Sequence, residues 1–203
     1  MRTVRIAALV EGDGEVAGVP LLIRRIAQSI DPTVRAVAPR GFRHPSGSIL
    51  RTGGLERAID AVAEIYPAHT VLVVIDSDDS CPKDLGQELQ ARARRSRPDL
   101  AVSVVLAHRE YEAWFLAAAE SLAGRRNLRQ DLSPPAAPEE IRDAKGWLSR
   151  QMPAASRYSP TQDQAALTSV FSLELAHKRS RSFRKLWKEI EDILQRAGPH
   201  PAS

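Results

Sequence analysis

Cysteine, aromatic residues and long apolar runs are all scarce in this chain of 203 residues. The single cysteine, Cys81, has no partner for an intrachain disulfide, which excludes a disulfide-stapled secreted scaffold. No apolar run approaches the roughly 20 residues that cross a bilayer, and the stretch Val71–Ile75 has the size of a strand. The opening Met-Arg-Thr-Val-Arg-Ile lacks the layout of a signal peptide. We therefore expect a cytoplasmic protein with no membrane partner.

The chain also lacks a Gly-x-x-x-x-Gly-Lys-Ser/Thr element, which excludes a P-loop ATPase. Its 43% hydrophobic and 27% charged residues are ordinary for a globular protein. A net charge of +4 and a pI of 9.6 are compatible with a polyanionic partner such as DNA or RNA. Each basic cluster taken singly is typical of a solvated helix face, so charge alone identifies no partner.

Strand and helix patterns alternate through the first part of the chain. A segment rich in proline, glycine and serine, Pro39–Gly54, is predicted to have no regular structure. The alternation predicts an α/β fold with a mostly parallel, four-stranded sheet that is flanked by helices on both faces. The expected strands are Val4–Val10, Thr33–Ala38, Thr70–Ile75 and Leu100–Ala107, and the expected helices are Ala17–Ile30, Leu55–Tyr66, Lys83–Ser96 and Glu110–Ala123.

The pattern changes after the proline-rich stretch Leu132–Pro138, beyond which the chain is predicted to be helical. We expect an α/β core over residues 1–130, a helical C-terminal extension over 131–197 and a disordered tail over 198–203. The expected helices of the extension are Pro138–Gln151, Thr161–His177 and Ser182–Arg196.

Acidic motifs follow three of the predicted strands. In an open parallel sheet, ligands bind at the carboxyl ends of the strands, so the coincidence indicates a functional site. Glu11 comes directly off the first strand, in the motif Glu-Gly-Asp-Gly-Glu. Glu15 ends this motif at the start of a helix, where capping of the helix is the alternative role.

The second motif is Asp-Ser-Asp-Asp, which begins at Asp76 after the third long strand. Strand alternation would point Asp76 and Asp78 to the same side, where two anions require a cation between them. Ligands that are all oxygen favour Mg²⁺ or Mn²⁺ over zinc. The alternative is a turn in which Asp side chains bond local backbone N–H groups, and Asp79 fits that alternative best.

The third motif is Arg-Glu-Tyr-Glu-Ala-Trp-Phe, which runs from Arg109 into a helix. Glu110 and Glu112 lie two positions apart, so on a helix they point in different directions. We expect one of them to reach the metal site and the other to cap a helix or to pair with an arginine. Trp114 and Phe115 are predicted to be core residues.

In order and identity these motifs resemble those of the Toprim superfamily, the metal-binding fold of topoisomerases, bacterial primases and overcoming-lysogenization-defect (OLD) nucleases. Glu11 matches the Glu that follows the first strand of those proteins, and Asp76 and Asp78 match their Asp-x-Asp. Glu15 and the element Arg109–Glu112 resemble further motifs of the OLD branch. The resemblance implies a Mg²⁺-dependent site for phosphodiester chemistry.

The whole chain is more similar still to the family known as domain of unknown function 4276. Its markers include the Glu-Gly-x-x-Glu opening, the Glu-Tyr-Glu-Ala-Trp helix start and the late Ser-Phe-Arg-Lys-Leu of Ser182–Leu186. This resemblance implies a separately encoded ATPase partner and a role in anti-phage defence. In OLD nucleases a lysine supports the chemistry; Lys145 is our candidate, with an exposed helix lysine as the alternative. Tyr158 and Gln162–Gln164 are candidates for closing over the site.

The favoured hypothesis is a Mg²⁺- or Mn²⁺-dependent nuclease that acts on DNA or RNA. Its catalytic candidates are Glu11, Asp76, Asp78 and Lys145, and its metal ligands are Glu11, Glu15, Asp76, Asp78, Glu110 and Glu112. The alternative is a non-catalytic or partner-activated binding module. An aspartyl-phosphate phosphatase or a nucleotide-sugar transferase fits less well, because the former places Asp-x-Asp after its first strand and the latter leaves Glu-Gly-x-x-Glu unexplained. The oligomeric state stays open.

Overall fold

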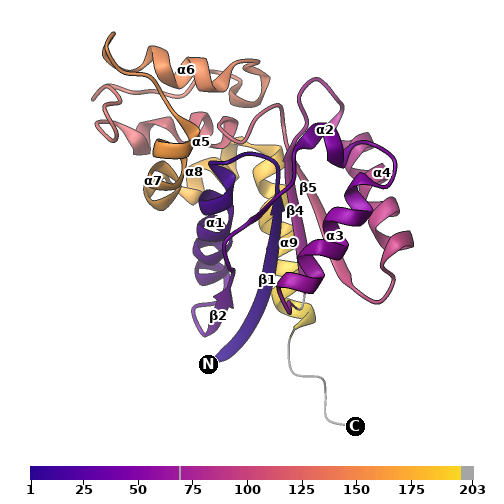
Figure 1. Ribbon diagram of the computed structural model, residues 1–203. Helices are drawn as coiled ribbons and strands as arrows, with labels where there is room; N and C mark the ends of the chain where they lie inside the picture. Colours follow the sequence, from indigo (N-terminus) through magenta and orange to yellow (C-terminus); the bar gives the residue numbers. More distant parts are fainter. Residues whose placement is uncertain (69, 198–203) are drawn as a thin grey trace.

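A parallel sheet of five strands carries the fold (Figure 1). The computed structural model describes residues 1–68 and 70–197, so the predicted tail 198–203 lies outside the described residues. The strand order is β2-β1-β4-β5, with β3 also paired to β1, and every pair is parallel. The strands are β1 (Arg2–Val10), β2 (Val34–Val37), β3 (Phe42–Arg43), β4 (Thr70–Asp76) and β5 (Ala101–Ala107).

The sheet has one strand more than the four we predicted, and the segment Pro39–Gly54 is not irregular. It contains the two-residue strand β3 and the short helix α2 (Ser46–Ile49). Phe42 and Arg43 pair with the end of β1, and Ile49 is fully buried. Tertiary pairing therefore overrides the local turn signals, which indicated a loop.

Side chains of β1 alternate between the two faces of the sheet, as the period of a strand requires. Val4, Ile6, Ala8 and Val10 belong to the core on one face, together with residues of α1 (Glu15–Ile30) and α9 (Arg181–Arg196). Leu9 belongs to the core on the other face, beneath α3 (Gly54–Ile65) and α4 (Pro82–Ser96). The predicted arrangement of a parallel sheet covered on both faces is confirmed.

The segment after β5 is helical, as predicted, but its helices are shorter. The predicted helix Glu110–Ala123 begins only at Ala113, and Thr161–His177 is interrupted because Ser172 starts a new helix by accepting the N–H of Leu175. The elements are α5 (Ala113–Ala117), 3₁₀ turns (Ala119–Leu122 and Pro138–Glu140), α6 (Ala144–Arg150), a π-helical turn (Pro160–Gln164), α7 (Ala165–Val170), α8 (Leu173–Arg179) and α9.

The C-terminal helices share one hydrophobic core with β1 and α1. Trp114 and Phe115 are fully buried, which confirms that they are core residues. Their rings meet Phe183 of α9 and Phe171 edge to face, at centroid distances of 5.6 and 5.4 Å. Among the described helices none has the length and apolar character of a membrane span.

Candidate functional site

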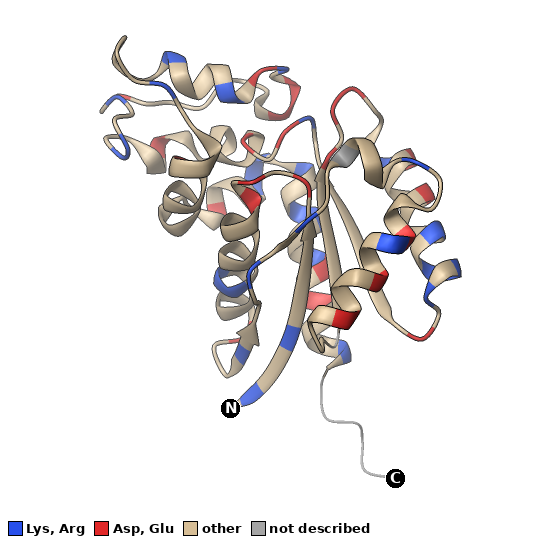
Figure 2. Cartoon of the chain, viewed as in Figure 1, with Lys and Arg blue, Asp and Glu red and all other residues tan. Residues whose placement is uncertain are grey.

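A cavity of about 360 Å³ lies at the carboxyl ends of β1 and β4, where Figure 2 shows acidic positions gathered on the loops. Five carboxylates line it, and they come from three separate strand-to-helix junctions. These carboxylates belong to Glu11, Asp13, Glu15, Asp76 and Glu112. The remaining lining residues are Gly12, Gly14, Arg43, Pro45, Lys145, Pro160, Thr161 and Gln164.

Glu15 anchors the loop that follows β1. As the first residue of α1 it is buried, and its Oε2 accepts the backbone N–H groups of Glu11 at 3.2 Å and Gly12 at 3.3 Å. The carboxylate thus binds the preceding loop rather than N–H groups of its own helix. Burial, followed by the charge of Glu11, raises the pKa of Glu15 from its ordinary 4.5 to about 7.

Gly14 allows the π-helical turn to approach this loop. Its backbone has ordinary right-handed dihedrals, so glycine is needed here for space and not for conformation. A Cβ at Gly14 would collide with the side chain of Gln164 and lie 2.6 Å from the carbonyl oxygen of Pro160. Single π turns often occur at functional sites, and this one forms a wall of the cavity.

Asp76 ends β4 with a side chain that is only 9% exposed. Its Oδ1 accepts the backbone N–H of Tyr111 at 2.8 Å. Burial raises the pKa of Asp76 well above its ordinary value, and the charges of Glu15 and Glu112 raise it further. A carboxyl group in this setting is neutral or needs a cation beside it.

Glu112 is the deepest acid of the site. Tyr158 donates its hydroxyl to Glu112 Oε1 at 2.8 Å and is itself buried, although it does not line the cavity. The buried Oε2 of Glu112 makes no hydrogen bond within the described part of the chain. Burial raises the pKa of Glu112, although the charge of Lys145 opposes this shift.

Lys145 places its ammonium group among three carboxylates. Its Nζ lies 3.4 Å from Glu112 Oε2, 3.7 Å from Glu110 Oε1 and 3.9 Å from Asp76 Oδ2. Burial alone would lower the pKa of Lys145, but these three acids raise it, the charge of Glu112 most of all. Lys145 is therefore cationic at neutral pH and partly balances the acidic cavity.

Two of the predicted ligands do not line the cavity. Asp78 is exposed and has a φ of 48°, because β4 ends at Asp76 and strand alternation does not extend beyond it. Glu110 accepts the backbone N–H of Lys145 at 3.1 Å and so binds the first turn of α6. Asp79, in turn, pairs with Arg109 and Arg142, both at 2.7 Å.

Sequence reasoning missed part of the cavity wall. Arg43 of β3 pairs with Asp13 at 3.0 Å, and no pattern signals a strand of two residues. Pro160 had no signal of its own, whereas Gln164 belongs to the segment Gln162–Gln164 that was a candidate for closing over the site, and it lies close to Gly14 because glycine carries no Cβ. Only the folded chain brings these positions to the carboxylates.

The donor set suits a hard cation. Every acidic donor is a carboxylate oxygen, the type that Mg²⁺ and Mn²⁺ prefer. Within residues 1–68 and 70–197, no group of three or more His, Cys, Asp or Glu side chains has the spacing of a formed metal centre. To bind an ion, the carboxylates would therefore have to rotate toward it, and Lys145 would have to move away from them. The chemistry of the donors fits such an ion.

The family model described as a domain of unknown function, DUF4276, matches residues 10–191. The chain belongs to the DUF4276 family. The match runs from the end of β1 into α9, so the family includes both the sheet and the helical segment. No curated protein and no solved structure matches the chain significantly. The DUF4276 match gives the cavity a family context but no reaction.

Proposed function

We propose that this protein is a divalent-cation-dependent phosphodiester hydrolase that acts on nucleic acid. The observation that carries the proposal is the convergence of Glu11, Glu15, Asp76 and Glu112 on one cavity. Burial raises the pKa values of Glu15, Asp76 and Glu112, and the charges of neighbouring acids raise them further. A bound cation would remove this conflict, and the sequence motifs resemble those of Toprim and OLD nucleases.

In this proposal Glu11, Glu15, Asp76 and Glu112 hold Mg²⁺ or Mn²⁺. When bound, the ion would activate a water molecule and stabilise the charge that develops on the phosphodiester. Lys145 would turn from the carboxylates toward the anionic substrate and neutralise charge in the transition state. Tyr158 keeps Glu112 oriented through its hydroxyl hydrogen bond. Asp78 and Glu110 lie outside this set.

The direct test compares Asp76→Asn with Asp78→Asn. Asparagine at position 76 keeps an oxygen that can accept the N–H of Tyr111, so the fold should persist. Loss of the ligand charge should slow Mn²⁺- or Mg²⁺-dependent cleavage about a hundredfold. Cleavage of plasmid DNA, single-stranded DNA and tRNA is measured, and metal binding is followed by titration calorimetry.

Asp78→Asn is the matched control, because this residue is exposed and asparagine tolerates its left-handed backbone. This variant should cleave within about twofold of the wild type, as surface substitutions outside a site generally do little. A fully active Asp76→Asn protein would end the proposal.

The position of Lys145 favours a second candidate, an effector that stays silent until a partner activates it. Its ammonium group lies where a cation would balance Asp76 and Glu112, so it competes with a metal ion. Lys145→Met should then tighten Mn²⁺ binding. In the directly active enzyme the same substitution should chiefly lower kcat. An ATPase partner in anti-phage defence, which the family resemblance implies, would be the activator.

A further inference from the structure

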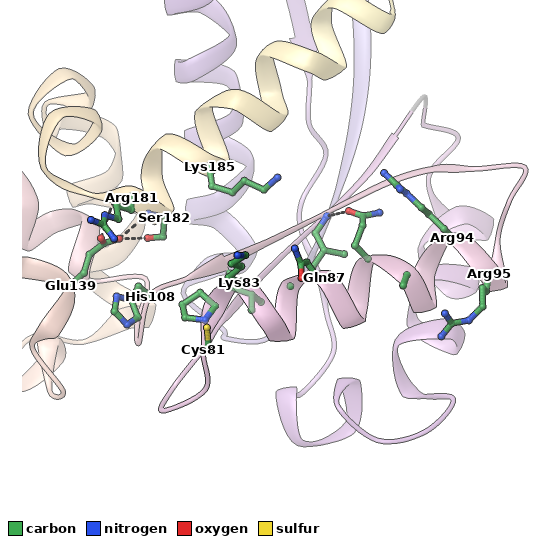
Figure 3. A pocket seen from close by; sticks show the side chains of 16 residues that line it. Cys81, Lys83, Gln87, Arg94, Arg95, His108, Glu139, Arg181, Ser182 and Lys185 are labelled. Atoms are coloured by element: carbon green, nitrogen blue, oxygen red, sulfur yellow. Dashed lines mark hydrogen bonds between the residues drawn. The ribbon is translucent and has the colours of Figure 1, made fainter.

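A second and larger cavity, of about 840 Å³, forms a groove along β5 (Figure 3). It shares no lining residue with the carboxylate cavity. Helix α4 borders it on one face of the sheet and α9 on the other, because the two helices belong to opposite cores. Val104 and Leu106 of β5 line it between the helices. Since β5 is the last strand in the sheet order, an open strand edge lies in this groove.

The backbone of this edge faces the groove at alternate residues. Ser77 N–H donates to the carbonyl oxygen of Ala107, so Ala107 turns toward β4. By alternation, the N–H and C=O groups of Val104 and Leu106 turn outward, away from β4. An added strand would pair with these groups.

A side-chain amide already imitates such a strand. Gln90 of α4 donates from Nε2 to the carbonyl oxygen of Val102 at 2.8 Å and accepts the N–H of Val104 at 2.9 Å. One side-chain amide thus makes the two hydrogen bonds that the N–H and C=O of one residue in a parallel neighbouring strand would make. Gln90 protects part of the edge and leaves the part at Leu106 to the groove.

The rim of the groove is strongly cationic. Five cationic side chains line it. Lys185 pairs with Glu189, whereas no ion pair or side-chain hydrogen bond within the described residues engages the charged groups of the other four, which are Lys83, Arg94, Arg95 and Arg181. Glu139, the acid of the groove, is engaged by hydrogen bonds from Ser180, Arg181 and Ser182. Figure 3 shows Lys83 and Arg94 on α4 and Lys185 on α9.

These features favour a peptide over a nucleic acid. Among the described residues no Phe, Tyr or Trp lines the groove, so a base would find no aromatic ring except His108 on which to stack. Apolar walls and an open strand edge instead suit an extended polypeptide. Residues 198–203, Gly-Pro-His-Pro-Ala-Ser, contain no Asp or Glu and include two prolines, which cannot donate to a strand.

We propose that an acidic, extended segment of a partner protein docks in this groove as an added parallel or antiparallel strand beside β5. Its backbone pairs with the outward groups of Val104 and Leu106, and its acidic side chains meet Lys83, Arg94 and Lys185. The Gln90 amide swings away to admit it. The proposal does not depend on the chemistry of the carboxylate cavity.

Binding is tested with a fluorescent peptide of about nine residues in which pairs of glutamates alternate with pairs of valines, so that an added strand presents acids both to α4 and to α9. Polarisation should report binding that weakens as salt is raised. Arg94→Glu combined with Lys185→Glu should weaken it about tenfold or more. Arg125→Glu, an exposed arginine outside the groove, is the matched control and should change binding less than about twofold.

Two further comparisons separate strand addition from charge attraction. A peptide with proline at its centre should bind about tenfold more weakly, because proline removes a ladder hydrogen bond. Gln90→Ala should tighten binding of the unmodified peptide about threefold, because the competing amide is gone.

Equal affinity for the proline peptide and the unmodified peptide would overturn the proposal. So would single-stranded DNA that binds more tightly than the peptide and responds to the same two charge reversals. Asp76→Asn should bind the peptide like the wild type, which keeps this result separate from the nuclease test.

Discussion

The acids of the carboxylate cavity and the partly buried Glu139 have pKa values that are shifted in opposite directions. In the cavity at the ends of β1 and β4, burial and neighbouring carboxylates raise the pKa values of Glu15 and Asp76. Near the start of α9, Glu139 is also partly buried, and burial alone would raise its pKa. Hydrogen bonds from the side chains of Ser182 and Ser180 and from two backbone N–H groups lower the pKa of Glu139 instead.

This difference in pKa shift distinguishes an acid that stabilises the fold from acids that form a functional site. Glu139 is satisfied by the helix N-terminus and by Ser182, which also accepts a hydrogen bond from Trp114, so its charge stabilises the folded protein. The cavity acids repel one another, so their charges destabilise the protein when no cation is bound. Strongly perturbed acids gathered in a cavity are typical of functional sites, whereas a satisfied one is typical of a helix cap.

The largest change in stability should come from Glu139→Ala. The substitution leaves the hydroxyl groups of buried Ser180 and Ser182 and the N-terminus of α9 without their acceptor. We expect the free energy of unfolding to fall by about 2–4 kcal/mol, measured by urea denaturation. The neighbouring and exposed Glu140 gives the control, since Glu140→Ala should change it by less than about 0.5 kcal/mol. Equal changes in the free energy of unfolding at the two positions would contradict the structural role of Glu139.

Gly14→Ala tests how tightly the loop of the cavity is packed. Its new Cβ meets Gln164 and Pro160, so the π-helical turn must move away. A cost of about 1–3 kcal/mol is expected from such overpacking, and the same urea experiment measures it. Gly47→Ala serves as the comparison, because a Cβ there meets nothing within 4 Å. Unchanged stability of Gly14→Ala would mean that the turn is loosely held.

Glu15→Gln should have the opposite sign to Glu139→Ala. Glutamine keeps an oxygen for the N–H groups of Glu11 and Gly12 but removes a charge that burial opposes. At pH 8 without divalent cations, we expect a gain of roughly 1–2 kcal/mol in the free energy of unfolding. The gain should be lost in saturating Mn²⁺. Destabilisation by this substitution would show that the charge of Glu15 is already compensated.

The pH dependence of stability gives a smaller effect. Because the pKa of Glu15 is raised on folding, the folded protein binds more protons between pH 4.5 and about 7, and stability falls as the pH rises through this range. Glu139 acts in the reverse sense: its contribution is present above its ordinary pKa of 4.5 and is lost as the pH falls through its lowered pKa. The urea midpoint of unfolding, measured with a chelator present, should therefore be highest at about pH 5. Glu15→Gln should reduce the fall in this midpoint at higher pH.

The sequence predicted much of the fold, because buried strands and amphipathic helices leave periodic patterns. The Val- and Leu-rich run of β4 and the strand-end position of Asp76 were both evident from it. The short β3 was not, because a two-residue strand has no pattern and exists through its pairing with Leu9 and Val10. The predicted role of Asp78 assumed a strand that continues past Asp76, whereas the backbone turns at a φ of 48°.

By itself the sequence determined which residues carry charge and that three acidic motifs follow strands, since local pattern and hydrophobic burial decide where strands end. Only the tertiary structure decided which of these acids meet. Glu112 lies in the cavity and Glu110 binds the start of α6, a distinction that depends on how α5 packs. The open edge of β5 likewise has no signature in its own residues, because a strand becomes an edge only through the order of the whole sheet.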